Sequence, residues 1–183
     1  MNPELSYLAG LFEGEGTISI EIRREPRCRY GIRLFPYVEF TISLDDSIII
    51  EDFKKYIHVN WLTVTKREHN VIKIRLRDQE SIKQFIEILS PYFRLPTTQR
   101  KAEIMLKILS KMGKHKRGGF SKNEFIELLN LTKELKSLQK KQRNRAKTKI
   151  DYLISKISSE PCEPADEGNG GKPFLNAGSF LLQ

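Results

Sequence analysis

The stretch Leu8-Ala9-Gly10-Leu11-Phe12-Glu13-Gly14-Glu15-Gly16 decides how this chain is interpreted, because it joins an apolar helical segment to two acids separated by one glycine. Asn2 is a favourable N-cap residue and Pro3 suits the first helical position, so a helix is predicted from Pro3 to about Glu13. The two acids would therefore lie at the carboxyl end of this helix.

Gly14 and Gly16 allow the backbone to leave the predicted helix tightly after Glu13. The Glu15 carboxylate and the Gly14 carbonyl would then face outward together, and such oxygen atoms are the ligands that a hard cation such as Mg2+ takes. The plain alternative is a short amphipathic helix whose glutamates are simply solvated.

These nine residues resemble the motif of the LAGLIDADG homing endonuclease family, with glutamate in place of aspartate at both acidic positions. The resemblance implies that Glu15 is a catalytic metal ligand, with Mg2+ as cofactor or Mn2+ or Ca2+ in its place in vitro. It implies a more structural role for Glu13, beside a helix interface. It also implies an α+β fold of order αββαββα, with a four-stranded antiparallel saddle sheet followed by C-terminal helices.

Length and composition bound the class of protein. A chain of 183 residues with 39% hydrophobic residues can bury a core. Its apolar runs are far shorter than the roughly 20 residues that a bilayer requires, so we expect an intracellular protein with no membrane span. Two cysteines are too few for a disulfide framework. A net charge of +9 favours a polyanionic partner, although proteins from hot environments are also basic.

Residue patterns after the motif agree with the resemblance, which covers roughly residues 4 to 110. Apolar residues alternate with polar ones in the strand-like segments, and Asp or Ser precedes the helical ones. The predicted elements are strands over 17–23 and 37–44, a helix from 45 to 55, strands over 61–66 and 71–77, and helices over 78–89 and 99–112.

The segment beyond this core is basic and then of low complexity. Ser121 and Glu124 fit a capping box, which predicts a further helix to about Leu135. The densely positive run 140–147 suits phosphate contacts, a solvated helix face or a linker. We expect three parts: a core domain over 1–112, a basic C-terminal helical extension over 113–157 and a disordered tail over 158–183.

The chain contains a single copy of the motif, and the resemblance therefore implies a homodimer whose motif helices pack about a two-fold axis. Ser6, Gly10 and Gly14 recur at a spacing of four, which places small residues on one helix face. With Glu13 they form the predicted dimer interface. The alternative is that the two glycines pack closely within one subunit.

Relatives place a basic residue after the last core helix, where it steadies the attacking water or the phosphate. Pro96 and Thr97 stand where this lysine is expected, so Lys101 is the candidate, with Arg94 and Arg100 as alternatives. The polar residue that often follows the second strand is equally open. Ser43 and Asp45 are the candidates there.

The resemblance assigns recognition of double-stranded DNA to the outer face of the sheet, where side chains reach base edges in the major groove. A solvated exposed face is the alternative for any single residue. The predicted DNA-binding residues are Ser19, Glu21, Arg23, Tyr37, Glu39, Thr41, Thr63, Thr65, Arg67, Lys73 and Arg75 on the strands, with Arg24, Arg27, Arg29 and Arg33 meeting phosphates from the loop.

The sequence thus predicts an enzyme that makes a double-strand break at a long pseudo-palindromic site and promotes mobility of its host intron or intein. No small-molecule substrate is expected. Two other functions compete with this hypothesis. An intron RNA maturase would keep the acids, whereas a non-catalytic DNA-binding regulator would lose them. The three histidines show no paired metal-ligand spacing.

Overall fold

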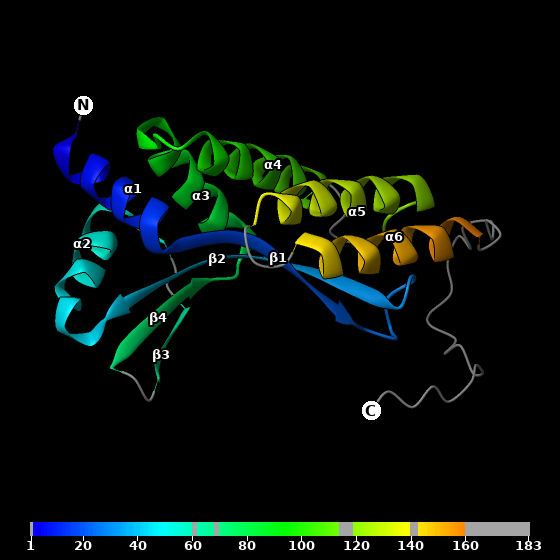
Figure 1. Cartoon of the computed structure of the whole chain (residues 1–183), viewed down its shortest axis with the longest axis horizontal. Helices are drawn as coiled ribbons and strands as arrows, with labels where there is room; N and C mark the ends of the chain where they lie inside the picture. The colour runs from blue at the N-terminus through cyan, green and yellow to red at the C-terminus, as the bar shows by residue number, and fades with distance from the viewer. Residues whose placement is uncertain (1, 60–61, 68–69, 114–118, 140–142, 160–183) are drawn as a thin grey trace.

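The structure is a computed structural model that describes residues 2–59, 62–67, 70–113, 119–139 and 143–159. The chain folds into a curved sheet backed by helices (Figure 1). The helices are α1 (Pro3–Glu15), α2 (Ile48–Tyr56), α3 (Gln79–Leu89), α4 (Pro96–Gly113), α5 (Lys122–Ser137) and α6 (Arg143–Ser159), with short 3-10 turns η1 (Leu44–Asp46) and η2 (Ser90–Tyr92).

The sheet is four-stranded and antiparallel, in the order β1-β2-β4-β3. Its strands are β1 (Gly16–Arg24), β2 (Ile32–Ser43), β3 (Leu62–Arg67) and β4 (Val71–Leu76). Helices α1, α3 and α4 lie on one side of the sheet, while the concave side below β2, β3 and β4 carries no helix in the described part of the chain (Figure 1). The predicted αββαββα order is confirmed.

Helix α1 begins as the sequence predicts, because the Asn2 side chain accepts hydrogen bonds from the backbone N–H groups of Glu4 and Leu5. Its end differs from the prediction. The helix continues through Gly14 and stops at Glu15, two residues later than expected. Gly14 is therefore an ordinary helical residue, and it is not the point at which the backbone turns.

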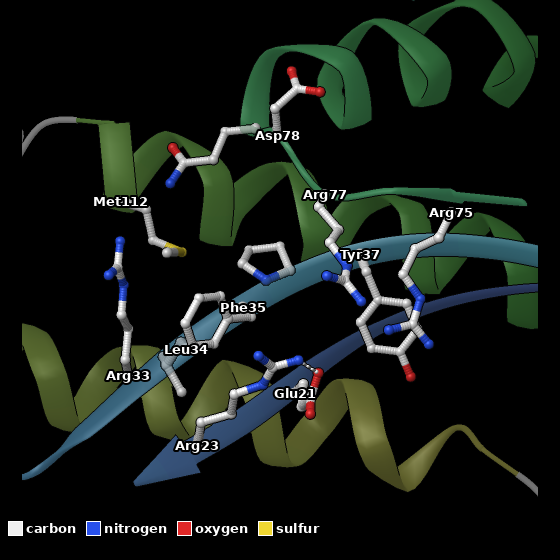
Figure 2. A pocket seen from close by; sticks show the side chains of 12 residues that line it. Glu21, Arg23, Arg33, Leu34, Phe35, Tyr37, Arg75, Arg77, Asp78 and Met112 are labelled. Atoms are coloured by element: carbon white, nitrogen blue, oxygen red, sulfur yellow. Dashed lines mark hydrogen bonds and ion pairs between the residues drawn. The ribbon is translucent and has the colours of Figure 1, made fainter. Parts of the chain in front are cut away.

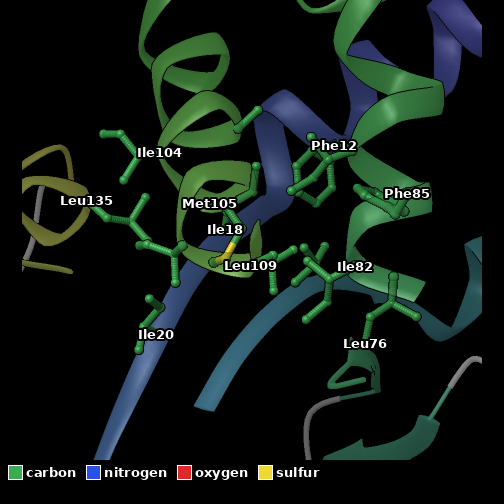
Figure 3. Packing of buried hydrophobic residues seen from close by; sticks show 14 of the residues in the cluster. Phe12, Ile18, Ile20, Leu76, Ile82, Phe85, Ile104, Met105, Leu109 and Leu135 are labelled. Atoms are coloured by element: carbon green, nitrogen blue, oxygen red, sulfur yellow. The ribbon is translucent and has the colours of Figure 1, made fainter. Parts of the chain in front are cut away.

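Gly16 is the residue that turns the chain from α1 into β1, because the Phe12 side chain lies directly over it. A Cβ atom at Gly16 would overlap the Phe12 ring and the Phe12 carbonyl oxygen. The same ring packs against Phe85, with ring centroids 4.9 Å apart, and stacks on Phe93 at 5.9 Å (Figure 3 shows the neighbourhood). The end of α1 is thus fixed to α3 and to the segment that follows it.

Substitution of Gly16 by alanine should destabilise the fold, because the added methyl group must displace a buried aromatic ring. We expect a loss of about 1–3 kcal/mol in the free energy of unfolding, measured by chemical denaturation. Gly113→Ala is the matched control, since a Cβ there meets nothing within 4 Å. If both variants unfold at the same denaturant concentration, the Phe12 contact does not constrain this turn.

Strand β2 starts at Ile32, five residues before the predicted start at Tyr37. The sequence pattern missed this part because Pro36 lies within it, and proline ordinarily interrupts a central strand. β2 pairs with β1 along the whole of 32–40, but it pairs with β4 only from Val38 onward. Pro36 therefore sits where β2 has one paired neighbour, and its missing N–H interrupts no ladder with β4.

Two helix starts also differ from the prediction. Ser47 occupies the N-cap position of α2 without a side-chain cap, and the 3-10 turn η1 precedes it. Helix α4 begins at Pro96, three residues before the predicted Gln99, because proline occupies its first turn. The capping box predicted at Ser121 and the start of α3 after Asp78 are confirmed, since the Asp78 side chain accepts a hydrogen bond from the Ser81 N–H.

The C-terminal helices pack onto the core. Phe125, Leu128 and Leu135 of α5 and Ile150 of α6 belong to the same buried cluster as Phe12. The three-part division of the chain stays a prediction, and the tail beyond Ser159 lies outside the described residues. Among the described helices, none combines the length and the hydropathy that a membrane span requires.

Candidate functional site

The carboxyl end of α1 carries an unusual arrangement of charge. The carboxyl end of a helix carries a partial negative charge, so basic residues are favourable there and acidic residues are unfavourable. The last turn of α1 contains Glu13 and Glu15 and has no basic residue. Glu15 and Gly14 are both exposed. The last carbonyl groups of a helix also lack partners within it, so this end concentrates oxygen atoms that attract a cation.

The two acids of α1 have different surroundings. The Glu13 carboxylate (Oε1) accepts a hydrogen bond of 2.7 Å from the backbone N–H of Leu95, just before α4. Glu15 has no hydrogen bond or ion pair to any described residue, and it points away from the protein's own core. Glu15 is therefore the acid that is available to a metal ion.

The described residues contain no group of three His, Cys, Asp or Glu side chains placed to hold a metal. A site at the end of α1 would thus be incomplete in one subunit. The exposed Glu15 carboxylate and the Gly14 carbonyl fit a hard cation by their chemistry, with further ligands from a second subunit, DNA or water. The polar candidate Ser43, at the end of β2, accepts a hydrogen bond from the backbone N–H of Asp45, with 3.4 Å between the heavy atoms.

The three basic candidates after α3 differ in their partners. Arg100 forms ion pairs with Glu134 of α5, at 2.5 Å, and with Glu103, at 3.0 Å. These hydrogen bonds, the one to Glu134 most of all, raise the pKa of Arg100. Arg100 therefore joins α4 to α5. Lys101 is half-buried in the first turns of α4, and Arg94 is exposed without an ion pair to any described residue.

The exposed face of α1 is a stripe of Pro3, Tyr7, Gly10 and Gly14. A Cβ atom at Gly10 or Gly14 would meet nothing within 4 Å. The glycines are therefore not required for packing against the described residues of the subunit. Ser6 is half-buried and its hydroxyl donates to the Asn2 carbonyl at 3.1 Å, so its place at a dimer interface stays a prediction. Tyr7 on the stripe is 58% exposed.

A compact ion cluster occupies the open face of the sheet. Glu39 of β2 binds Lys73 through Oε1, at 2.5 Å, and it binds Arg75 of the neighbouring strand β4 through Oε2. The Arg75 guanidinium also lies 4.5 Å from the centre of the Tyr37 ring (Figure 2). Arg75 is thus held in one orientation, and its Nη1 group has no partner among the described residues.

A second pair lies at the edge strand β1. Arg23 donates to Glu21 at 2.7 Å, and this hydrogen bond holds the pKa of Glu21 below its usual value (Figure 2). Arg23 also lies over the Phe35 ring. These side chains line a hollow of about 410 Å³. The prediction that Ser19 lies exposed on this face is wrong, since the residue is only 1% exposed.

The arginines predicted to meet phosphates from a loop lie in and beside the segment between β1 and β2. Arg24 is the last residue of β1 and Arg33 lies in β2, so of the four only Arg27 and Arg29 belong to the loop. All four are exposed. Tyr30 anchors the loop, because its ring stacks on Phe125 at 4.6 Å and its hydroxyl donates to the Phe120 carbonyl at 3.0 Å. The side chains of Thr63, Thr65 and Arg67, and those of the basic run 140–147, lie outside the described residues; Thr41 is half-buried on the open face.

Sequence reasoning missed the role of Glu39 as the partner of two cations. The register of the strands contains the signal, because Glu39 and Arg75 are directly paired across β2 and β4. Opposite charges at such positions attract one another. No sequence pattern indicates that Glu13 binds Leu95, since Leu95 is 82 residues away and contributes only its backbone N–H.

Comparison with known proteins agrees with this geometry. The profile of the LAGLIDADG endonuclease family matches residues 8–109, from the first residue of the motif to the end of the core. The chain belongs to the LAGLIDADG endonuclease family. A search of curated proteins gives no match.

Solved structures of this family share the fold. The homing endonuclease I-CvuI, solved with a DNA target and Mg2+, superposes with a TM-score of 0.69 at 19% identity, over 86% of this chain and 96% of its own. I-TnaI gives 0.66 at 16% identity, over 86% and 99% of the two chains. The archaeal intron-encoded I-Vdi141I, solved with DNA, gives 0.66 at 18% identity, over 85% and 96%.

Proposed function

We propose that this protein is a homodimeric, metal-dependent DNA endonuclease that makes a double-strand break at a long pseudo-palindromic site. Cleavage of this kind would promote the mobility of a host intron or intein. The observation that carries the proposal is the contrast between the two acids of α1. The Glu13 carboxylate binds the Leu95 N–H of the same subunit, whereas Glu15 is exposed near Gly10 and Gly14, where an added Cβ atom would meet no described atom within 4 Å.

A second copy of the chain explains both features at once. Two α1 helices packed through Tyr7, Gly10 and Gly14 would approach closely, because glycine has no side chain to separate the backbones. The two Glu15 carboxylates would then lie near each other at the end of the helix pair. Two acids related by a two-fold axis match the symmetry of two scissile phosphates in a palindromic duplex.

The residues at this site would bind and orient the reacting groups. Glu15 and the Gly14 carbonyl would hold Mg2+, which when bound lowers the pKa of a water molecule and stabilises charge on the attacking and leaving oxygen atoms. Lys101, or the exposed Arg94, would hold a non-bridging phosphate oxygen. Arg100 is left out of this assignment because its charge is taken up by Glu134 and Glu103.

The open sheet face would read the DNA sequence. Arg75 is oriented by Glu39 and Tyr37 and offers its free N–H groups in a fixed direction, as a contact to a guanine edge requires. Arg23, held by Glu21, is arranged in the same way. The arginines of the β1–β2 loop would meet phosphates, which position the duplex without reading it.

Substitution of Glu15 by glutamine should abolish cleavage and leave DNA binding intact. Glutamine keeps the size of the side chain but removes the charge that holds the cation. The substrate is a plasmid carrying the uninterrupted host-gene junction, or a duplex obtained by cleavage selection from a random pool with Mg2+. Linear product is measured on gels and affinity by fluorescence anisotropy.

Glu87→Gln is the matched control for this experiment, because it removes the same charge from an exposed position of α3. It should cleave as the wild type does. If Glu15→Gln protein makes double-strand breaks at the wild-type rate, the metal-hydrolysis assignment is wrong. If wild-type protein binds intron RNA and cuts no DNA, the maturase hypothesis takes its place.

Substitution of Gly10 by leucine should convert the dimer into a monomer that is still folded. A Cβ atom at Gly10 meets no described atom within 4 Å in the single subunit, whereas the leucine side chain would block close approach of a second α1 helix. Multi-angle light scattering should give a dimer mass for the wild type and a monomer mass for the variant, with little change in the melting temperature. Gly113→Leu, at the end of α4 where an added Cβ likewise meets no described atom within 4 Å, should remain dimeric. A monomeric wild type that cuts both strands would rule out this arrangement.

Glu39 and Arg75 should have opposite effects on DNA binding. Arg75→Ala should weaken binding to the preferred site by about 1–3 kcal/mol and relax its sequence preference. Glu39→Gln removes a negative charge from the face, so it should bind random duplex more tightly and with a steeper dependence on salt. Anisotropy titrations at two salt concentrations test this, with Glu87→Gln as control. Equal behaviour of Glu39→Gln and wild type on both duplexes would contradict the assignment.

A further inference from the structure

The start of α4 is capped by a residue from another element. Pro96 is the first residue of α4, and the Leu95 carbonyl accepts hydrogen bonds from the N–H groups of Thr98, at 2.9 Å, and Gln99, at 3.1 Å. Leu95 therefore occupies the N-cap position. Its apolar side chain cannot accept the hydrogen bonds that a Ser or Asp would accept there. Its own backbone N–H is bound by the Glu13 carboxylate of α1.

Helix α5 shows the local version of the same arrangement. Its N-cap Ser121 donates its backbone N–H to the Glu124 carboxylate at 2.9 Å, three residues further along the same helix. This is half of a capping box. In α4 the equivalent third position is Thr98, which is buried and has no carboxylate. Glu13 supplies the missing acid from a distant part of the chain.

We propose that Glu13, from a distant part of the same chain, completes the N-terminal cap of α4. It is a positioning residue that fixes the start of α4 relative to Glu15. The inference rests on the proposed function of Glu15. It gives the two acids of the motif separate tasks: Glu15 holds the cation, and Glu13 holds the segment that carries Arg94 and Lys101.

Three contacts make this junction rigid. The Glu13 carboxylate oxygen accepts the hydrogen bond from the Leu95 N–H. The Phe12 ring stacks on Phe93, with ring centroids 5.9 Å apart. The Gln99 side chain donates to the Phe93 carbonyl at 2.7 Å. Of these contacts, only the one from Glu13 starts within one turn of Glu15 and ends on the backbone of the N-cap.

The two acids can be separated by experiment because they use different properties of a carboxylate. To accept an N–H hydrogen bond requires an oxygen atom, which glutamine also offers. To hold a divalent cation requires the charge, which glutamine lacks. Glu13→Gln should therefore behave as the wild type does, Glu13→Ala should be impaired, and Glu15→Gln should be inactive.

The first readout is independent of activity. Amide hydrogen exchange of Leu95, measured by NMR on the full chain, should accelerate at least tenfold in Glu13→Ala, because the N–H loses its acceptor. Glu13→Gln and Glu87→Ala should keep the wild-type protection. Unchanged protection of the Leu95 N–H in Glu13→Ala would overturn the capping of α4 by Glu13, whether or not the protein cleaves DNA.

The second readout is the single-turnover cleavage rate at saturating protein, on the duplex that the wild type cleaves. Misplacement of a catalytic group by about 1 Å can cost up to 100-fold, so Glu13→Ala should cleave roughly 10–100-fold more slowly with unchanged DNA affinity. Glu13→Gln should restore the rate. Cleavage by Glu13→Ala at the wild-type rate would overturn the positioning role. So would a Glu13→Gln variant as inactive as Glu15→Gln, which would make Glu13 a metal ligand.

Discussion

The contact between Phe12 and Gly16 is the constraint on which the rest of the site depends. The Phe12 ring fills the space that a Cβ atom at position 16 would need, so the chain turns from α1 directly into β1 beneath it. The same ring packs on Phe85 and Phe93 and so ties the end of α1 to α3 and to the approach to α4. With the helix end fixed in this way, its last residues, Gly14 and Glu15, are held at the surface.

Because of the position of this helix end, Glu13 and Glu15 have different roles. Glu13 faces its own subunit and meets the start of α4, where the helix dipole favours a negative charge. Glu15, two residues later, faces outward at the negative end of α1, where a second carboxylate is unfavourable unless a cation compensates it. One local sequence thus provides a structural clamp and a candidate metal ligand within a single turn.

Sequence periodicity was enough for much of the fold and for part of the site. The alternation of Ile18 and Ile20 with polar residues marks β1, and the caps at Asn2, Asp78 and Ser121 mark helix starts, because these signals are local. What escaped prediction depends on distant partners. Gly14 predicts the end of the helix, but α1 ends at Glu15 and the chain turns at Gly16, where the Phe12 ring leaves no room for a Cβ atom. Pro36 looks like a strand breaker, but β4 does not extend to it. The pairing of Arg75 with Glu39 likewise depends on strand register.

The most direct test of this account is the anomalous diffraction of Mn2+ in crystals of the protein bound to a duplex selected from a random pool. The account predicts manganese peaks coordinated by the Glu15 carboxylates of two subunits packed through their α1 helices, while each Glu13 remains on the N–H of Leu95. Manganese coordinated by Glu13, or bound elsewhere with both Glu15 side chains free, would contradict it.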